Sequence, residues 1–348
     1  MAATTVEAVA DRALARGVDF LWVRQLVDGE FPTLVWPAVD PHADGEFDST
    51  VFTTALVVYA LRFVPGERAA AMRARAVRFL VSQQSGPGVW RFWTSKSQLH
   101  RWIPPDLDDT CCALFALRDA GVALPPSERL VLSNRSRAGL FYTWLLPGRD
   151  AHSTLRLLRW AHFSFRQHPF WQNTEAERDD IDGVVNANTL LYLGDRAESR
   201  LPVDYLLGTL AAVNEASCDK WHLSKFNFYY MVSRAYFHGV ASLGAARATV
   251  VERIAEAAVT QGGIETALDV ALAACSLLNF DADRGLIGRL ASRLVSSQAP
   301  AGGWPRSALF FGGPKRVYGW GSEELTTAVS LEALARYIGP EEVEGETA

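Results

Sequence analysis

The sequence predicts an all-α protein, an (α/α)6 barrel in which an inner ring of helices is covered by an outer ring. Two observations support this fold class. Apolar residues recur at helical spacing with little strand-like alternation, and one helical segment is repeated along the chain. The string "TTALVVYAL" at residues 53–61 recurs as "TTAVSLEAL" at 326–334, and three further segments fit the same register, at 109–117, 185–193 and 265–273.

One small polar residue occupies the same position in every copy of the repeat. These anchor residues are Thr54, Thr110, Asn186, Thr266 and Thr327. A sixth inner helix of similar character is predicted at 226–239. More polar, Arg-bearing helices are expected between the copies, at 69–83, 127–140, 203–214, 247–260 and 285–297. An open solenoid is the alternative, but the irregular spacing of the anchors favours a closed ring.

The composition is that of a globular protein with one large core. The chain has 348 residues, of which 49% are hydrophobic and 21% charged. We expect a single barrel domain over residues 1–340, a lid-like insertion near 150–180, and an acidic disordered tail at 341–348. A net charge of −5 argues against a nucleic-acid partner.

The chain is expected to be cytoplasmic. No apolar run reaches the roughly 18 residues of a membrane span, and the N-terminus is predicted to form an amphipathic helix and not a signal peptide. The four cysteines contain no C-x-x-C pair, which favours reduced thiols. Peripheral contact with a membrane stays compatible with this composition.

Three aspartates, Asp106, Asp108 and Asp109, occupy four positions directly before an apolar helix, in "PPDLDDT". Asp106 is expected to cap that helix, because its side chain can accept hydrogen bonds from free backbone N–H groups. Like charges on one turn favour the retention of a proton on one carboxyl, whereas the helix N-terminus favours ionisation.

The repeat separates the roles of Asp106 and Asp108. Four residues before the anchor, most copies have a polar residue, as a cap position would; these residues are Thr50, Asp106, Asp182, Gly262 and Glu323. Two residues before the anchor, the other copies are apolar, with Phe52, Val184, Ile264 and Leu325. Because burial of an unpaired carboxylate is costly, Asp108 is expected either to be a hydrogen-bonded structural aspartate or to keep a proton for chemistry.

Two loops share a Gln, a Gly and a Trp. They are "QQSGPGVW" at 83–90 and "QAPAGGW" at 298–304, each at the end of a predicted outer helix. The Gln can bond free groups at helix ends while the Trp packs beneath it. We therefore expect both loops to tie neighbouring helices together.

With these loops and an Asp-x-Asp-Asp-Thr at an inner helix, the chain resembles class II terpene cyclases, the squalene–hopene cyclase and diterpene cyclase superfamily. The resemblance implies protonation of an alkene or epoxide of a linear isoprenoid or prenyl diphosphate, followed by cyclisation through carbocations. It implies Asp108 as the proton donor, tuned by Asp106 and Asp109, and no metal or cofactor for the protonation. Most such cyclases enclose the site between two barrels. In a single barrel, a homodimer partner, a membrane surface or residues 150–180 would close the mouth.

Carbocation chemistry requires π-faces near the substrate. The candidates near inner-helix starts are Trp90, Trp93, Trp102, Tyr229, Tyr230, Tyr318 and Trp320, with core packing as the alternative for each. A diphosphate would require a cationic partner, for which Lys225, Lys315 and Arg316 are candidates, or solvated loop charges. Asp182 and its neighbours in "DDID" could hold Mg²⁺ on a diphosphate, or cap a helix. Asn186 and Asn188 could orient the acid or a water.

Three rival interpretations stay open. "DTC" at 109–111 and "CDKWH" at 218–222 offer ligands for a zinc-dependent prenyltransferase-like protein. Asp108 and Asp182 could be the carboxylate pair of an (α/α)6 glycosidase or lyase. A non-catalytic isoprenoid-binding homologue is the third.

Overall fold

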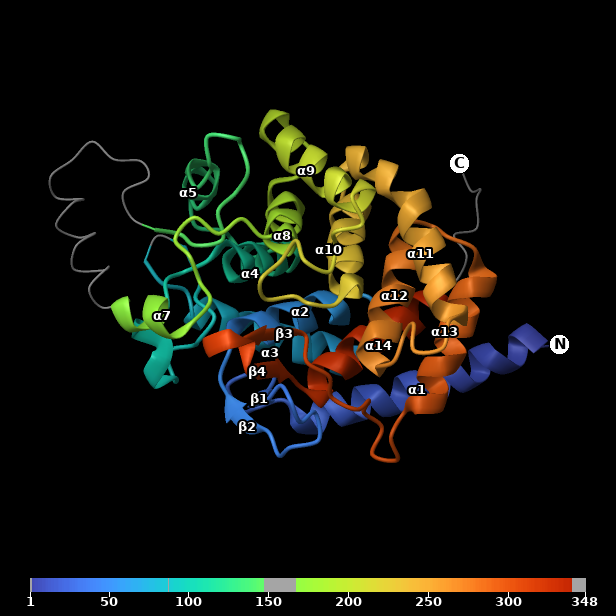
Figure 1. Cartoon of the computed structure of the whole chain (residues 1–348). Helices are drawn as coiled ribbons and strands as arrows, with labels where there is room; N and C mark the ends of the chain where they lie inside the picture. Colours follow the sequence, from blue (N-terminus) through green and yellow to red (C-terminus); the bar gives the residue numbers. More distant parts are fainter. Residues whose placement is uncertain (1, 87, 147–166, 340–348) are drawn as a thin grey trace, which may run out of the picture.

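Six helices form a closed inner ring in the computed structural model, which describes residues 2–86, 88–146 and 167–339. They are α2 (Val51–Leu61), α4 (Leu107–Asp119), α8 (Gly183–Leu193), α10 (Lys225–Phe237), α12 (Ala267–Asn279) and α14 (Glu323–Ile338). Each helix contacts the next, and α14 returns to α2 (Figure 1). The predicted all-α barrel is confirmed.

An outer layer covers this ring. Its helices are α1 (Ala2–Arg24), α3 (Glu67–Ser82), α5 (Glu128–Ser133), α9 (Arg200–Ala211), α11 (Arg247–Val259) and α13 (Arg284–Ser297). The prediction of a helix over 127–140 was wrong for its second half. There the Asn134 side chain donates a hydrogen bond to the Tyr142 carbonyl, and Gly139 has φ of 80°, so the chain turns back after α5. The remaining short helices are η1 (Gln98–Arg101), α7 (His168–Asn173), η2 (Ala197–Ser199), η3 (Ala241–Ala246) and η4 (Pro314–Arg316).

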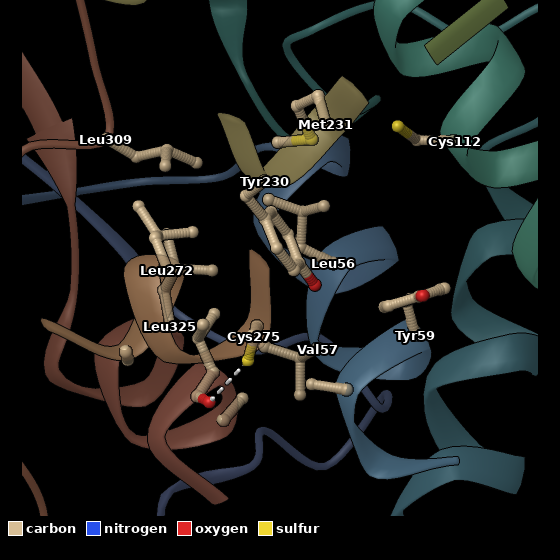
Figure 2. Packing of buried hydrophobic residues seen from close by; sticks show 14 of the residues in the cluster. Leu56, Val57, Tyr59, Cys112, Tyr230, Met231, Leu272, Cys275, Leu309 and Leu325 are labelled. Atoms are coloured by element: carbon tan, nitrogen blue, oxygen red, sulfur yellow. Dashed lines mark hydrogen bonds between the residues drawn. The ribbon is translucent and has the colours of Figure 1, made fainter. Parts of the chain in front are cut away.

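The inner helices are buried on nearly every side. All residues of α2 are buried, which explains why its sequence is apolar throughout instead of amphipathic. Figure 2 shows side chains of α2, α10 and α12 meeting in the interior, among them Leu56, Tyr230 and Cys275. Small residues such as Ala and Cys on these helices permit close packing between ring neighbours.

The anchor residues hold the preceding loop against the start of each inner helix. Four anchors accept a hydrogen bond from a buried backbone N–H at 3.0 Å: Phe31 to Thr54, Trp90 to Thr110, Phe141 to Asn186 and Trp304 to Thr327. The fifth, Thr266, caps α12 by accepting from the Asp269 N–H. The repeated small polar residue therefore satisfies a backbone donor that the core would otherwise leave unpaired.

The tryptophans of the two Gln–Gly–Trp loops make the same connections, whereas the glutamines differ, since Gln83 accepts from Ser95. Trp90 and Trp304 are fully buried, and their indole N–H groups donate to the carbonyls of Leu80 at 2.8 Å and Leu294 at 2.7 Å. Gln298 donates to the carbonyl of Ala13 on α1. Each Trp thus links the end of an outer helix to the start of the next inner helix.

A small antiparallel sheet, absent from the predicted architecture, lies beside one end of the ring. Its strand order is β2-β1-β4-β3, with β1 (Thr33–Pro37), β2 (Glu46–Asp48), β3 (Phe310–Gly312) and β4 (Tyr318–Gly321). Strands of this length are too short to show alternation in the sequence. Pairing of β1 with β4 brings the N-terminal part of the chain to its C-terminal part.

Most of the segment predicted as a lid, and the whole predicted tail, lie outside the described residues, which omit 147–166 and 340–348. Within 167–180, the described part forms α7 and a loop that bends at 174–175 and turns at 178–179. No helix among the described residues is long and apolar enough to cross a membrane.

Replacement of Thr110 or Thr327 by Val should destabilise the fold by about 1–3 kcal/mol each, because the buried N–H of Trp90 or Trp304 loses its acceptor. Urea unfolding monitored by circular dichroism measures this free energy. The control is Thr260→Val at an exposed helix end, where water can replace the lost hydrogen bond. Equal stability of all three variants would contradict the anchoring role.

Candidate active site

The three aspartates lie at the start of α4, and they differ in exposure. Asp106 is the N-cap: its side chain accepts from the Asp109 N–H at 2.7 Å, which confirms the predicted cap. Asp106 and Asp109 are buried, with 4% and 3% exposure. The Asp108 side chain is 13% exposed, because it faces a cavity. The position two residues before the anchor thus faces inward, as the apolar copies indicated.

Both carboxylate oxygens of Asp108 have a hydrogen-bonding partner. Asn188 Nδ2, on α8, donates to Oδ1 at 2.6 Å. His222 Nε2, shortly before α10, lies 3.2 Å from Oδ2. The acid on α4 is therefore held by the two elements that follow it around the ring.

A second set of contacts fixes these partners. Arg234 Nη2, fully buried on α10, donates to Asn188 Oδ1 at 2.5 Å. Since the amide oxygen accepts from Arg234, the amide nitrogen has to face Asp108. The His222 backbone N–H donates to Asp219 Oδ1 at 2.9 Å, and the His222 ring lies 5.6 Å from that of Phe52.

Burial sets the electrostatics of this cluster. It raises the pKa of Asp106 to about 7. Burial first, and then the charges of Asp106 and Asp108, raise the pKa of Asp109 well above its usual value. For His222, burial opposes protonation, but the Asp108 hydrogen bond and the nearby carboxylates outweigh it and raise the pKa. Burial therefore favours the neutral form of the Asp109 carboxyl.

Asp106, Asp108 and Asp109 line one side of a cavity whose other walls are mostly apolar. The space between these walls, counted out to the open mouth, is about 680 Å³. Its aromatic and aliphatic lining comprises Phe52, Phe92, Trp93, Ile103, Trp144, Phe170, Val185, Trp221, Phe310, Phe311 and Trp320. A carboxylic acid here faces a largely apolar space with many π-faces.

Of the aromatic candidates named from the sequence, Trp93 and Trp320 line the cavity. Trp90 is buried beneath α3, and Trp102 and Tyr318 are exposed outside the lining. Tyr229 and Tyr230 are buried, and their hydroxyls donate to Glu215 at 2.6 Å and Glu332 at 2.7 Å.

The polar candidates also lie outside the described cavity lining. Asn186 exchanges hydrogen bonds with the backbone of Phe141. Lys225 lies over the Phe226 ring. Lys315 and Arg316 are exposed in the β3–β4 loop, two and three residues after Gly313 of the lining.

Asp180 and Asp182, two of the three aspartates predicted to hold Mg²⁺, already have hydrogen-bonding or ion-pair partners, whereas Asp179 is exposed. Asp182 accepts from the Thr143 hydroxyl at 2.6 Å and from the Lys220 N–H at 2.9 Å. Asp180 accepts from the Trp144 indole and pairs with Lys220 Nζ. Since all four carboxylate oxygens are engaged in holding the loop before α8, they are not free to bind a cation. Asp182 is also too buried to be the second carboxylate of a glycosidase.

The main omission of the sequence-based interpretation is His222, which it considered only as a zinc ligand. Trp144, Trp221 and Phe310 were also missed. None of these residues lies within a copy of the repeat, so the internal comparison gave no signal for them. The one available sign was the position of His222 three residues before Lys225, where the sixth inner helix begins.

Comparisons with known proteins support the same fold. No family model and no curated protein sequence matches the chain. The structure is similar to a protein from Actinoplanes (TM-score 0.69, 19% identity, 95% of this chain and 100% of that one). It is also similar to the type II terpene cyclase MstE from Scytonema in complex with its substrate geranylgeranyl dihydroxybenzoate (0.67, 15%, 96% and 99%). A third is ent-copalyl diphosphate synthase from Streptomyces platensis (0.55, 20%, 83% and 50%). The fold is therefore that of type II terpene cyclases.

The raised pKa of Asp106 predicts a pH-dependent stability. Between the ordinary value of 3.8 and about 7, the folded state binds more protons than the unfolded one, so stability falls as pH rises through this window. Asn also caps helices well, so Asp106→Asn should keep the cap and remove this loss. The stability of the variant relative to wild type should be at least about 1 kcal/mol more favourable at pH 7.5 than at pH 4.5.

Urea unfolding at the two pH values measures this difference. Asp195→Asn, at an exposed position, is the control and should show the same relative stability at both. A flat difference for Asp106→Asn would show that burial does not hold a proton on Asp106.

Proposed function

We propose that the protein is a class II terpene cyclase in which Asp108 protonates an alkene or epoxide of a linear isoprenoid. The observation that supports this most directly is the placement of Asp108. It is the partly exposed carboxyl of the three, it faces an aromatic cavity, and both its oxygens are hydrogen-bonded. The type II terpene cyclase fold of the chain is consistent with this chemistry.

The first step breaks the O–H bond of Asp108 and forms a C–H bond at the substrate alkene, leaving a tertiary carbocation. Hydrogen bonds from Asn188 and His222 stabilise the negative charge on the carboxylate that remains. The neighbouring double bonds then supply the electron pairs of new C–C bonds, and the charge moves along the chain. Loss of a proton from the last cation forms an alkene, so the overall reaction is an isomerisation.

The cavity supplies the two other conditions for this chemistry. Its apolar lining excludes water, which would otherwise capture the cation. Its π-faces each stabilise a nearby cation by roughly 0.5–2 kcal/mol. No metal ion or cofactor takes part in the protonation that we propose.

The polar end of the substrate is best sought at the cavity mouth. MstE was crystallised with geranylgeranyl dihydroxybenzoate, and the similar Streptomyces enzyme makes ent-copalyl diphosphate. We therefore propose a prenylated aromatic or a prenyl diphosphate as substrate. Lys315 and Arg316, close in sequence to Gly313 of the lining, are the candidate contacts for the head group.

The zinc-dependent alternative is less consistent with the site. Asp219 accepts from the backbone N–H groups of Val184, Trp221 and His222, and His222 pairs with Asp108. Among the described residues, no three His, Cys, Asp or Glu side chains gather where they could share a metal ion. Elemental analysis of the purified protein would detect stoichiometric zinc, and finding it would favour the alternative.

Asp108→Asn should lower the rate of cyclic product formation by about 10²–10⁴-fold, since it removes the acid and keeps the shape. The purified protein is incubated with farnesyl and geranylgeranyl diphosphate, squalene and geranylgeranyl dihydroxybenzoate, and the extracts are analysed by mass spectrometry. Asp195→Asn is the exposed control and should match the wild type.

Substrate binding separates an enzyme from a binding protein. Asp108→Asn should still bind the substrate, measured by quenching of tryptophan fluorescence. Equal product from wild type and Asp108→Asn would refute the assignment of the acid. Binding without turnover by the wild type would favour the non-catalytic homologue.

A further inference from the structure

One carboxylate oxygen joins two aromatic residues of the cavity. Asp48 Oδ2 accepts a hydrogen bond from Trp93 Nε1 and another from Trp320 Nε1, each at 2.8 Å. Asp48 ends strand β2, Trp320 lies in β4, and Trp93 lies in the segment between α3 and η1. The small sheet is therefore the element that places Asp48 between the two indoles.

This arrangement fixes the orientation of both rings. An indole has a single N–H donor, so sharing one acceptor sets the direction of both Trp93 and Trp320. Trp320 is buried, with 7% exposure, and both rings line the cavity. Burial raises the pKa of Asp48; when Asp48 is ionised, each of these hydrogen bonds is stronger than one to a neutral acceptor.

The aromatic rings follow one another outward from the acid. The His222 ring, next to Asp108, lies 6.1 Å from Phe310. Phe310 in turn stacks on Trp320, with centroids 5.7 Å apart and planes at 9°. These contacts connect the acid, through His222 and Phe310, to Trp320. A substrate that follows this series would place a cation at its protonated end near Phe310, and a cation that has moved along the chain near Trp320.

We propose that Asp48 is a positioning residue that holds Trp93 and Trp320 so that their faces stabilise the cation formed after the first ring has closed. This inference rests on the proposed function and assigns different steps of the reaction to different residues of the cavity. Asp108 starts the reaction, and Asp48 acts through the two indoles on how far the reaction proceeds.

The chemistry gives this role a distinct signature. When the first ring closes, a double bond becomes a C–C single bond and the charge moves to the next tertiary carbon. If that cation is poorly stabilised, it loses a proton to a base and leaves as a monocyclic alkene, an isomer of the substrate. Loss of Asp48 should therefore change the product mixture more than the rate of substrate consumption.

The test compares the products of Asp48→Asn with those of wild type on the best substrate of the panel. The ratio of monocyclic to polycyclic product should rise roughly 3- to 10-fold, the range expected when a cation–π contact is weakened. Total substrate consumption should change by less than about threefold. Glu46→Gln removes a charge from the exposed part of the same strand and should leave both quantities unchanged.

Two further variants test the proposal even if Asp48→Asn fails to fold. Trp93→Phe and Trp320→Phe each keep an aromatic face but lose the N–H donor, and both should raise the same ratio. In the Trp93→Phe/Trp320→Phe double variant, Asp48→Asn should have no added effect on the ratio, whereas a purely structural role would still lower stability.

The outcomes test the role of Asp48 and the proposed function separately. An unchanged product ratio in Asp48→Asn, or equal loss of all products, would overturn the role of Asp48 while an active wild type upholds the proposed function. An additional shift in the triple variant would show that Asp48 acts by another route. Absence of any cyclic product from wild type would overturn the proposed function and this inference together.

Discussion

Both oxygens of Asp108 are hydrogen-bonded at the edge of an apolar cavity, and the rest of the site is arranged around this constraint. An unpaired carboxylate at this position would be too costly to keep, and water around it would capture a carbocation. Asn188 and His222 meet both requirements, because they hydrogen-bond Asp108 from the two elements that follow α4 around the ring. Arg234 fixes the orientation of the Asn188 amide, and Asp219 holds the backbone of His222.

The closed ring makes this meeting possible. Residues 108, 188 and 222 lie on successive inner elements, and closure brings the N-terminal ends of these elements to one side of the barrel. The anchor residues reinforce the arrangement, since each ties a loop to the start of an inner helix through a buried N–H. The cavity lies at the N-terminal ends of these inner helices. The interactions that stabilise the fold therefore also define the space in which a substrate would react.

The internal repeat explains why the sequence was informative about Asp106 and Asp108. Each copy of the repeat contains the start of an inner helix. Comparison of the copies therefore distinguishes a cap position from a position that faces inward. Trp90 shows the limit of this approach. It was named as a cavity residue because it stands near a helix entrance, but its indole binds the Leu80 carbonyl beneath the helix. Distance along the chain from a helix start does not determine on which side a side chain lies.

The sequence by itself determined the inner helices, the cap at Asp106 and the inward direction of Asp108, because these depend on local periodicity and on repetition. Only the tertiary structure decided which residues meet the acid and which aromatic faces line the cavity. His222, Arg234 and Asp48 come from segments outside the recurring pattern, and Asp48 lies 272 residues from Trp320. Contacts of this kind depend on how the ring and the small sheet close in space, and no local pattern in the chain encodes that closure.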